Sequence, residues 1–368
     1  MNQKKIAIFH NFMDNIGGAE LVTLNLAKNL NADIYTTDYN LEKIEQMGFE
    51  NIKIFSLGKI PFKMPFKHQI AFFKFRRLNL KKKYDFYIVS GEWAMSGLVN
   101  NKPNLWYIHG PLNEIWEFRD YIKKNLLKPW QVFPYEIWAM FNRFLSKKYI
   151  KHSKKLVCNS QNTQSRIKKY FKREARIICP SINTKEYCHN KPKDYWLSVN
   201  RLSPPKRVEM QVKAFLGLPN EKLIIVGSFD KNSDLSKAYQ NHLIELGSKN
   251  IEFKSGLGFQ ELRSLFANSK GFITTAENED FGITPVEAMA SGKPVIAGNE
   301  GGYKETIINE KTGILIDNIN SDKLAKEIRK MSKELEQNSD KYKKACQEQA
   351  KKFDTQEFIK KIKEEIEK

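Results

Sequence analysis

The stretch Thr274-Thr-Ala-Glu-Asn-Glu279-Asp-Phe-Gly282-Ile-Thr-Pro-Val-Glu287-Ala-Met-Ala-Ser-Gly292-Lys-Pro-Val-Ile-Ala-Gly-Asn-Glu-Gly301-Gly302 decides the fold class of this chain. An apolar, β-branched run that ends at Thr275 predicts a buried strand, and the polar residues after it predict a loop. Pro285 predicts the first turn of a helix, because the N–H that proline lacks has no helical partner there. Gly292 and Pro294 predict the end of that helix, and residues 294–297 predict the next buried strand. This succession predicts an α/β domain with a parallel sheet.

The same stretch places backbone donors and carboxylates close together. The free N–H groups and positive dipole end of a helix N-terminus favour phosphate. Glu279 falls on the loop and Glu287 within the first two turns of the helix. Carboxylates accept hydrogen bonds and do not hold phosphate, so they suit the hydroxyl groups of a sugar or a ribose. The stretch therefore predicts a site for a ligand that carries both phosphate and hydroxyl groups.

The order Glu279-Asp-Phe-Gly-x-x-Pro-x-Glu287-Ala-Met-Ala-x-Gly-x-Pro-Val-Ile-Ala resembles the signature of a large enzyme family. These are the retaining nucleotide-sugar glycosyltransferases with the GT-B fold, of the family-four (glycosyl transferases group 1) type. The resemblance implies an α/β fold of two Rossmann-like, doubly wound domains that face a central cleft. It also implies that Glu279 is catalytic, that Glu287 holds the ribose hydroxyls, and that Phe281, Gly282 and Ile283 bind the donor.

A second motif supplies cations. Tyr195-Trp-Leu-Ser-Val-Asn-Arg201-Leu-Ser-Pro-Pro-Lys206 reads as a strand that delivers Arg201, followed by Lys206 across a proline-stiffened turn. Two fixed cations neutralise a diphosphate, and arginine does so bidentately. The motif resembles the Arg and Lys pair that binds the donor diphosphate in this family, although Asn200 stands where the family usually has glycine.

The first half of the chain has the rhythm of another parallel sheet. A strand at residues 5–9 precedes Gly17 and Gly18, whose backbone allows close approach of a phosphate or a sugar, and a helix over residues 19–30 follows. His109 ends a later strand, at the edge where parallel sheets bind ligands. The alternative to a ligand contact is a histidine that is buried in the core with its hydrogen bonds satisfied. The resemblance implies that the two glycines bind the donor and that His109 contacts its sugar.

A chain of 368 residues is long enough for two domains. We predict an acceptor-binding domain over residues 1–185 and a donor-binding domain over residues 186–368. The resemblance implies that the nucleotide base lies near Leu257 and that the last helix, about residues 345–368, packs back on the first domain.

The net charge of +20 requires a cause. Between Glu50 and Asp85 there is no acidic residue, and lysines and arginines alternate there with phenylalanines. No nucleic-acid-binding module is recognisable, so we predict an anionic membrane surface as the partner and no nucleic acid. A solvated basic face is the plainer interpretation. The aromatic stretch over residues 116–144 is expected to be mostly core, with an acceptor groove or a membrane-dipping surface as alternatives.

The expected activity is transfer of a hexose, with mannose from GDP-mannose favoured and UDP-sugars open, to a lipid-linked or growing cell-envelope glycan. No cofactor and no metal are expected, because cationic side chains replace a metal at the leaving diphosphate. Four apolar residues after the first lysines are too few for a signal peptide. We therefore expect a cytoplasmic protein, peripheral on the inner face of the plasma membrane. Two alternatives stay open: a GT-B-fold nucleotide-sugar epimerase, and a basic nucleic-acid-binding protein without enzymatic activity.

Overall fold

The computed structural model describes residues 4–63, 65–228 and 234–368, and it divides into two compact units. Met1–Pro180 together with Phe358–Lys368 form the first unit, and Ser181–Glu357 form the second. Each unit is a parallel sheet covered by helices, the α/β class that the sequence predicts.

In the described residues of the first unit, seven strands pair in the order β3-β2-β1-β4-β5-β6-β7. They are β1 (Ile6–Phe9), β2 (Asp33–Thr36), β3 (Ile54–Ser56), β4 (Phe86–Val89), β5 (Asn104–Ile108), β6 (Lys155–Cys158) and β7 (Arg176–Ile177). The helices are α1 (Gly18–Leu30), α2 (Leu41–Gln46), α3 (Phe66–Arg77), η1 (Trp93–Val99), α4 (Arg119–Asn125), α5 (Pro129–Tyr149), η2 (Ile150–His152), α6 (Gln161–Phe171) and the last helix, α14 (Thr355–Glu367).

In the described residues of the second unit, six strands pair in the order β10-β9-β8-β11-β12-β13. They are β8 (Trp196–Arg201), β9 (Leu223–Ser228), β10 (Ile251–Lys254), β11 (Phe272–Ile273), β12 (Val295–Gly298) and β13 (Gly313–Ile316). The helices are η3 (Thr184–Glu186), η4 (Pro204–Lys206), α7 (Val208–Leu216), α8 (Asp234–Leu246), α9 (Phe259–Asn268), α10 (Ile283–Ala290), α11 (Tyr303–Thr306), α12 (Ser321–Gln337) and α13 (Lys343–Lys351). In both sheets the strand order reverses next to the first strand of the unit, and doubly wound folds bind ligands at this point.

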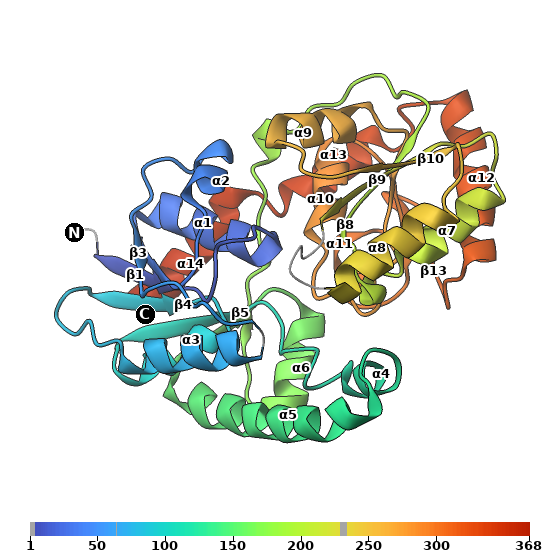
Figure 1. Cartoon of the computed structure of the whole chain (residues 1–368). Coiled ribbons are helices and arrows are strands. Elements are labelled where there is room, and N and C mark those ends of the chain that lie inside the picture. Colours follow the sequence, from blue (N-terminus) through green and yellow to red (C-terminus); the bar gives the residue numbers. More distant parts are fainter. Residues whose placement is uncertain (1–3, 64, 229–233) are drawn as a thin grey trace. The chain divides into compact units, whose positions relative to one another are not determined.

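Alternation along the strands gives the first sheet two apolar faces. Phe9 and Trp106 lie in one core cluster with Phe72 and Phe75 of α3. The neighbouring Tyr107 points to the other face, where its ring lies 5.8 Å from that of Phe358 in α14. Figure 1 accordingly shows α3 and α5 on one side of this sheet and α1 and α14 on the other.

The final residues of the chain are held by the first unit. Arg176 of β7 pairs with Glu364 at 3.1 Å, and the ammonium of Lys4 donates to the carbonyl of Ile366 at 2.8 Å. The predicted last helix over about residues 345–368 is in fact two helices. Of these, α13 packs against α10 in the second unit, and only the residues from Phe358 onward group with the first unit.

The expectation that the aromatic stretch over residues 116–144 is mostly core is wrong. Helix α5 leaves a row of large apolar side chains exposed, with Trp130 at 70%, Phe133 at 73% and Phe144 at 58% of their accessible surface. The basic stretch between Glu50 and Asp85 is mixed: Phe66 and Phe73 are exposed, whereas Phe72 and Phe75 are core residues. Within the described part of the chain, no helix combines the length and the apolar character needed to cross a membrane.

Candidate functional site

In the second unit, the predicted site residues gather at the carboxyl edge of neighbouring strands. Arg201 is the last residue of β8, and Lys206 ends the short helix η4 that follows it. Glu279 lies on the loop after β11, which pairs with β8. The parallel pairing therefore brings two motifs that are far apart in sequence to one edge of the sheet.

Lys206 and Glu279 form an ion pair, with Lys206 Nζ 2.5 Å from Glu279 Oε2. Both side chains are partly buried, at 30% and 19% of their accessible surface. The hydroxyl of Thr275 donates to the carbonyl of Lys206 at 2.9 Å and thereby fixes η4 against the end of β11. Arg201 is exposed, and its guanidinium makes no ion pair with any residue that the structure describes. One predicted cation is thus paired with the predicted catalytic glutamate, and the other faces solvent.

Arg207, to which the sequence analysis gave no role, organises the loop that carries Glu279. Its Nε donates to the carbonyl of Thr275 at 2.6 Å, and its guanidinium pairs with Glu300. Glu300 in turn accepts from the backbone N–H of Asn278 at 3.1 Å. Only the sequence adjacency of Arg207 to Lys206 could have drawn attention to it, because its partners come from two other segments.

Gly301 and Gly302 pack directly against the backbone of the same loop. The N–H of Gly302 donates to the carbonyl of Glu279 at 2.7 Å. A Cβ on Gly301 would lie 2.6 Å from both N and O of Glu279, and a Cβ on Gly302 would lie 2.5 Å from Cα of Phe281. Both glycines are therefore required because backbone packs on backbone at these positions.

We expect Gly301→Ala to destabilise the second unit by about 2 kcal/mol or more, because it adds a backbone overlap to the cost of a left-handed conformation. The φ of Gly301 is +56°. Denaturant unfolding measures the loss. Gly256→Ala is the matched control, since Gly256 has a φ of +70° but nothing within 4 Å of its Cβ position. Equal losses in the two variants would show that the contact with Glu279 carries no cost.

Glu287 is buried, with 6% of its surface exposed, and it has a partner that the sequence did not reveal. The hydroxyl of Tyr187 donates to its Oε1 at 2.5 Å. Burial raises the pKa of Glu287, although this hydrogen bond and the charge of Arg263 act in the opposite direction. Its second oxygen, Oε2, makes no hydrogen bond with a described residue. The hydrogen bond from Tyr187 holds the carboxyl group in one orientation.

The remaining donor-binding predictions fall on different kinds of position. Gly282 is the N-cap of α10 with a φ of +88°, and Ile283 is the first helical residue and partly buried. Leu257 is partly buried on the connection between β10 and α9. Phe281 is buried, with 3% of its surface exposed, and its ring centroid lies 5.3 Å from that of Phe353. Only the backbone of Phe281 is therefore suited to a donor.

In the first unit, His109 lies at the end of a buried polar chain that crosses three strands. Its Nε2 is 2.8 Å from Ser90 Oγ, which is 2.7 Å from Thr23 Oγ1. Thr23 Oγ1 is in turn 3.2 Å from Nδ1 of His10, and Nε2 of His10 lies 3.2 Å from Glu20. Glu20 also accepts from the N–H of Gly17 at 2.8 Å. The glycine loop and His109 are therefore parts of one network, which the sequence analysis had treated separately.

One assignment of donors satisfies every hydrogen bond along this chain. The hydroxyl of Thr23 donates to the carbonyl of Ala19 at 2.9 Å, so it accepts from Ser90 and from His10. Ser90 then accepts from Nε2–H of His109, which leaves Nδ1 of His109 as an acceptor. Burial, together with the charge of His10, lowers the pKa of His109 to about 3. With this assignment, His109 is a neutral imidazole whose Nδ1 can accept a hydrogen bond.

Glu20 is held in its ionised form. Burial alone would raise its pKa, but the hydrogen bond and charge of His10 and the N–H of Gly17 outweigh it, and the pKa falls to about 2. The N–H of Gly17, the N-cap residue of α1, is therefore already taken by Glu20.

Glu92, the N-cap residue of η1, provides a test of pH dependence. Loss of solvation raises its pKa to about 7, although a hydrogen bond from Ser146 Oγ, 3.0 Å long, acts against the shift. Because the folded state binds this proton more tightly than the unfolded state, the stability of the wild type falls as pH rises from 4.5 to about 7. Glu92→Gln removes that loss, so the stability of the variant relative to wild type is expected to be greater at pH 8 than at pH 5 by up to about 3 kcal/mol. Thermal unfolding at the two pH values measures it, and Glu45→Gln on α2 is the surface control. A relative stability that is the same at both pH values would contradict the buried titration.

The two doubly wound sheets, with cations and carboxylates at the carboxyl edge of the second, define the GT-B class of glycosyltransferase folds. Solved structures agree. The Anabaena protein HepE in complex with UDP and glucose matches with a TM-score of 0.78 at 20% identity, over 99% of each chain. Sucrose-phosphate synthase from Thermosynechococcus elongatus matches with a TM-score of 0.78 at 17% identity, over 98% of each chain.

Two family models divide the sequence between them. Glycosyltransferase Family 4 matches residues 16–186, and Glycosyl transferases group 1 matches residues 181–353. The first half of the chain therefore belongs to Glycosyltransferase Family 4, and the second half belongs to Glycosyl transferases group 1.

Curated relatives carry mannosyltransferase names. Alpha-1,3/1,6-mannosyltransferase alg-2 of Neurospora crassa is 32% identical over 33% of this chain and 32% of its own length. The mouse GDP-Man:Man(3)GlcNAc(2)-PP-Dol alpha-1,2-mannosyltransferase is 33% identical over 30% of this chain and 25% of its own. Alpha-1,3/1,6-mannosyltransferase ALG2 of Kluyveromyces lactis is 26% identical over 84% of this chain and 72% of its own length. The chain thus spans about a third of the length of the Neurospora relative and about a quarter of that of the mouse relative.

Proposed function

We propose that this protein transfers a hexose, with mannose favoured, from a nucleoside-diphosphate sugar to a lipid-linked or growing cell-envelope glycan. The observation that carries the proposal is the placement of Arg201, Lys206 and Glu279 at one edge of the second sheet. Cations and a carboxylate at one edge match the two halves of a nucleotide sugar, its diphosphate and its hydroxyl groups.

In this proposal each group has one task. Arg201 and Lys206 neutralise the diphosphate as it leaves, which stabilises the charge that develops in the transition state. Glu279 holds the sugar hydroxyls, and Glu287 holds the ribose. The two cations replace a divalent metal, so the transfer requires none. Retention at the anomeric carbon follows from the family resemblance, with the departing phosphate assisting attack from the same face.

The names of the relatives support the proposed substrates. The mouse relative's name specifies GDP-mannose and a PP-Dol-linked glycan, whereas the Anabaena structure holds UDP and glucose. The sequence from Glu279 to Met289 most resembles that of family members that use GDP-mannose, so we favour GDP-mannose as the donor and place UDP-sugars second.

Thermal unfolding with GDP, UDP, ADP and their sugar conjugates tests the donor. A ligand at a hundred times its dissociation constant adds about 2.7 kcal/mol to the free energy of unfolding. Stabilisation by GDP and GDP-mannose is the expected result, and it is then followed by transfer from labelled GDP-mannose to polyprenyl-linked glycans. Stabilisation by UDP compounds alone would keep the proposed enzyme class but assign a UDP-sugar as the donor. Absence of stabilisation by every nucleotide would overturn the proposed function.

A peripheral position on the inner face of the plasma membrane completes the proposal, and helix α5 supports it. Its exposed apolar side chains recur every three or four residues and form one row, the α5 stripe, which consists of Trp130, Phe133, Ile137, Met140, Phe141 and Phe144. Neighbouring helix α3, joined to α5 by a hydrogen bond of 2.8 Å from Gln69 to Asn142, adds exposed Phe66 and Phe73. Apolar rings flanked by lysines are the side chains that enter the interface of an anionic membrane.

Co-sedimentation with vesicles that contain an anionic phospholipid tests this position. The double variant Phe133→Ser, Met140→Ser is expected to bind at least about tenfold more weakly, because each buried apolar side chain contributes about 1.5–3 kcal/mol. The matched control is Leu216→Ser, Ile244→Ser, which removes two exposed apolar side chains from the second unit. Equal binding by both double variants would contradict a membrane role for the α5 stripe.

A further inference from the structure

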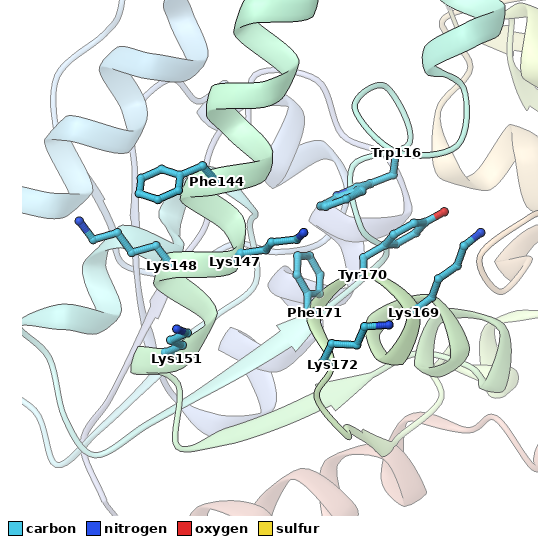
Figure 2. Close-up of a pocket in the computed structure, with 9 residues that line it drawn as sticks. All are labelled: Trp116, Phe144, Lys147, Lys148, Lys151, Lys169, Tyr170, Phe171 and Lys172. Carbon is cyan, nitrogen blue, oxygen red and sulfur yellow. The ribbon is translucent and has the colours of Figure 1, made fainter.

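A pocket of about 460 Å³ lies in the first unit, outside the groups assigned to transfer. It lies where the C-terminal ends of α5 and α6 approach each other. The lining residues are basic or aromatic: Trp116, Phe144, Lys147, Lys148, Lys151, Lys169, Tyr170, Phe171 and Lys172. Figure 2 shows Lys147, Lys148 and Lys151 on one side of the pocket and Lys169 and Lys172 on the other, with the rings of Trp116, Tyr170 and Phe171 between them.

The charge of this pocket is uncompensated within its lining. Five of the nine lining residues are lysines and none is acidic. Of the nearby carboxylates, Glu117 accepts from the hydroxyl of Tyr170 at 3.0 Å but also pairs with Arg166 at 3.0 Å, and Glu174 pairs with Lys168 at 2.8 Å. Cations at helix C-termini interact favourably with the helix dipole, and this accounts for single lysines at each end. The helix dipole does not account for the convergence of the lysines from both helices on one pocket.

The aromatic rings hold the ammonium groups around the rim. Trp116 stacks on Tyr170 with the ring centroids 4.5 Å apart and the planes inclined at 21°. Lys147 Nζ lies 5.5 Å from the centroid of Trp116, and Lys169 Nζ lies 5.0 Å from that of Tyr170. Such cation–π contacts keep charged groups beside apolar walls without neutralising them. The pocket is therefore suited to a compact anion attached to an apolar group.

We propose that this pocket binds the phosphate headgroup of a membrane lipid, with a phosphate monoester or diphosphate preferred over a diester. Phe144 links the two features, since it lines the pocket and is also the last residue of the α5 stripe. Acyl or prenyl chains then lie along the stripe while the phosphate enters among the lysines. The inference extends the proposed membrane contact and does not depend on the proposed transfer reaction.

Two probes separate a lipid from a free phosphate. The first is thermal unfolding with inorganic pyrophosphate at constant ionic strength, in an Arg201→Ala background that weakens anion binding at the candidate donor site. The second is co-sedimentation with vesicles that contain phosphatidic acid or phosphatidylglycerol at equal surface charge. The test variant is Lys147→Gln, Lys172→Gln. The control variant is Lys360→Gln, Lys363→Gln, which removes the same charge from exposed positions on α14.

We expect tighter binding to phosphatidic acid than to phosphatidylglycerol, and a loss of this preference in the test variant with at least about fivefold weaker binding. The control variant is expected to keep the preference. Survival of the preference in the test variant would overturn the proposal. Stabilisation by pyrophosphate without any preference among vesicles would overturn the lipid assignment and indicate a soluble phosphate. Stabilisation by donor nucleotides must be the same in test and control variants, so that a failed donor site is recognised separately.

Discussion

Arg201→Ala is expected to lower the rate of sugar transfer about 100-fold or more, because one preorganised donor to a developing charge contributes that much. The folded protein is expected to lose little of its stability. Arg201 is exposed at the end of β8 and makes no ion pair with a described residue, and surface substitutions of this kind change stability by about 0.5 kcal/mol or less. The measurement is kcat with the preferred donor, together with the unfolding temperature.

Two further variants make the result specific to the guanidinium. Arg201→Lys keeps the charge but loses bidentate geometry, so it is expected to recover only part of the rate. Lys213→Ala removes an exposed cation that pairs with Glu209 on α7 at 2.6 Å, and it is expected to transfer sugar at the wild-type rate. Near-wild-type turnover by Arg201→Ala would remove Arg201 from the proposed site.

The second large effect is expected for Lys206→Ala, again about 100-fold in kcat, since Lys206 is the other cation proposed to neutralise the leaving diphosphate. This variant also leaves the partly buried Glu279 without its ion-pair partner. Thermal unfolding separates the two consequences. Lys206→Ala is expected to weaken the stabilisation that the nucleoside diphosphate gives without its sugar. Glu279→Gln is expected to lower the rate of transfer and to leave that stabilisation unchanged.

The double variant Lys206→Ala, Glu279→Gln completes a cycle around this ion pair. Because the two side chains are in contact, their effects on transfer are expected to be smaller together than the sum of the single effects. Lys213→Ala serves as the charge control here as well. An undiminished response of Lys206→Ala to nucleoside diphosphate would show that Lys206 supports Glu279 and does not bind the donor.

The fold was predictable because its signals are local. The strands and helices around Glu279 and Glu287 are specified by apolar runs, by Pro285 at a first helical turn and by Gly292, whose φ is +69°. The carboxyl edge of a parallel sheet then follows from strand direction alone. Arg201, Lys206 and Glu279 were therefore identifiable as members of one edge.

The partners of these residues were not predictable in the same way. Tyr187 and Glu287, which share a hydrogen bond, are 100 positions apart in the sequence, and Arg207 and Glu300, which form an ion pair, are 93 positions apart. Single residues without a periodic pattern give no signal of such contacts. The polar chain from Glu20 through Ser90 to His109 is hidden for the same reason, since it depends on the order in which β1, β4 and β5 pair.

The sequence by itself determined the α/β class, the two motifs and the family resemblance, because periodicity, turn residues and spacing act over short segments. Only the tertiary structure decided which rings are buried, since α5 has apolar residues on more than one face and the rest of the first unit covers only one of them. It also decided that Phe281 is a core residue, that Lys206 pairs with Glu279, and that five lysines from two helices converge on one pocket. Burial and charge convergence depend on contacts between distant segments, and those contacts exist only once the chain has folded.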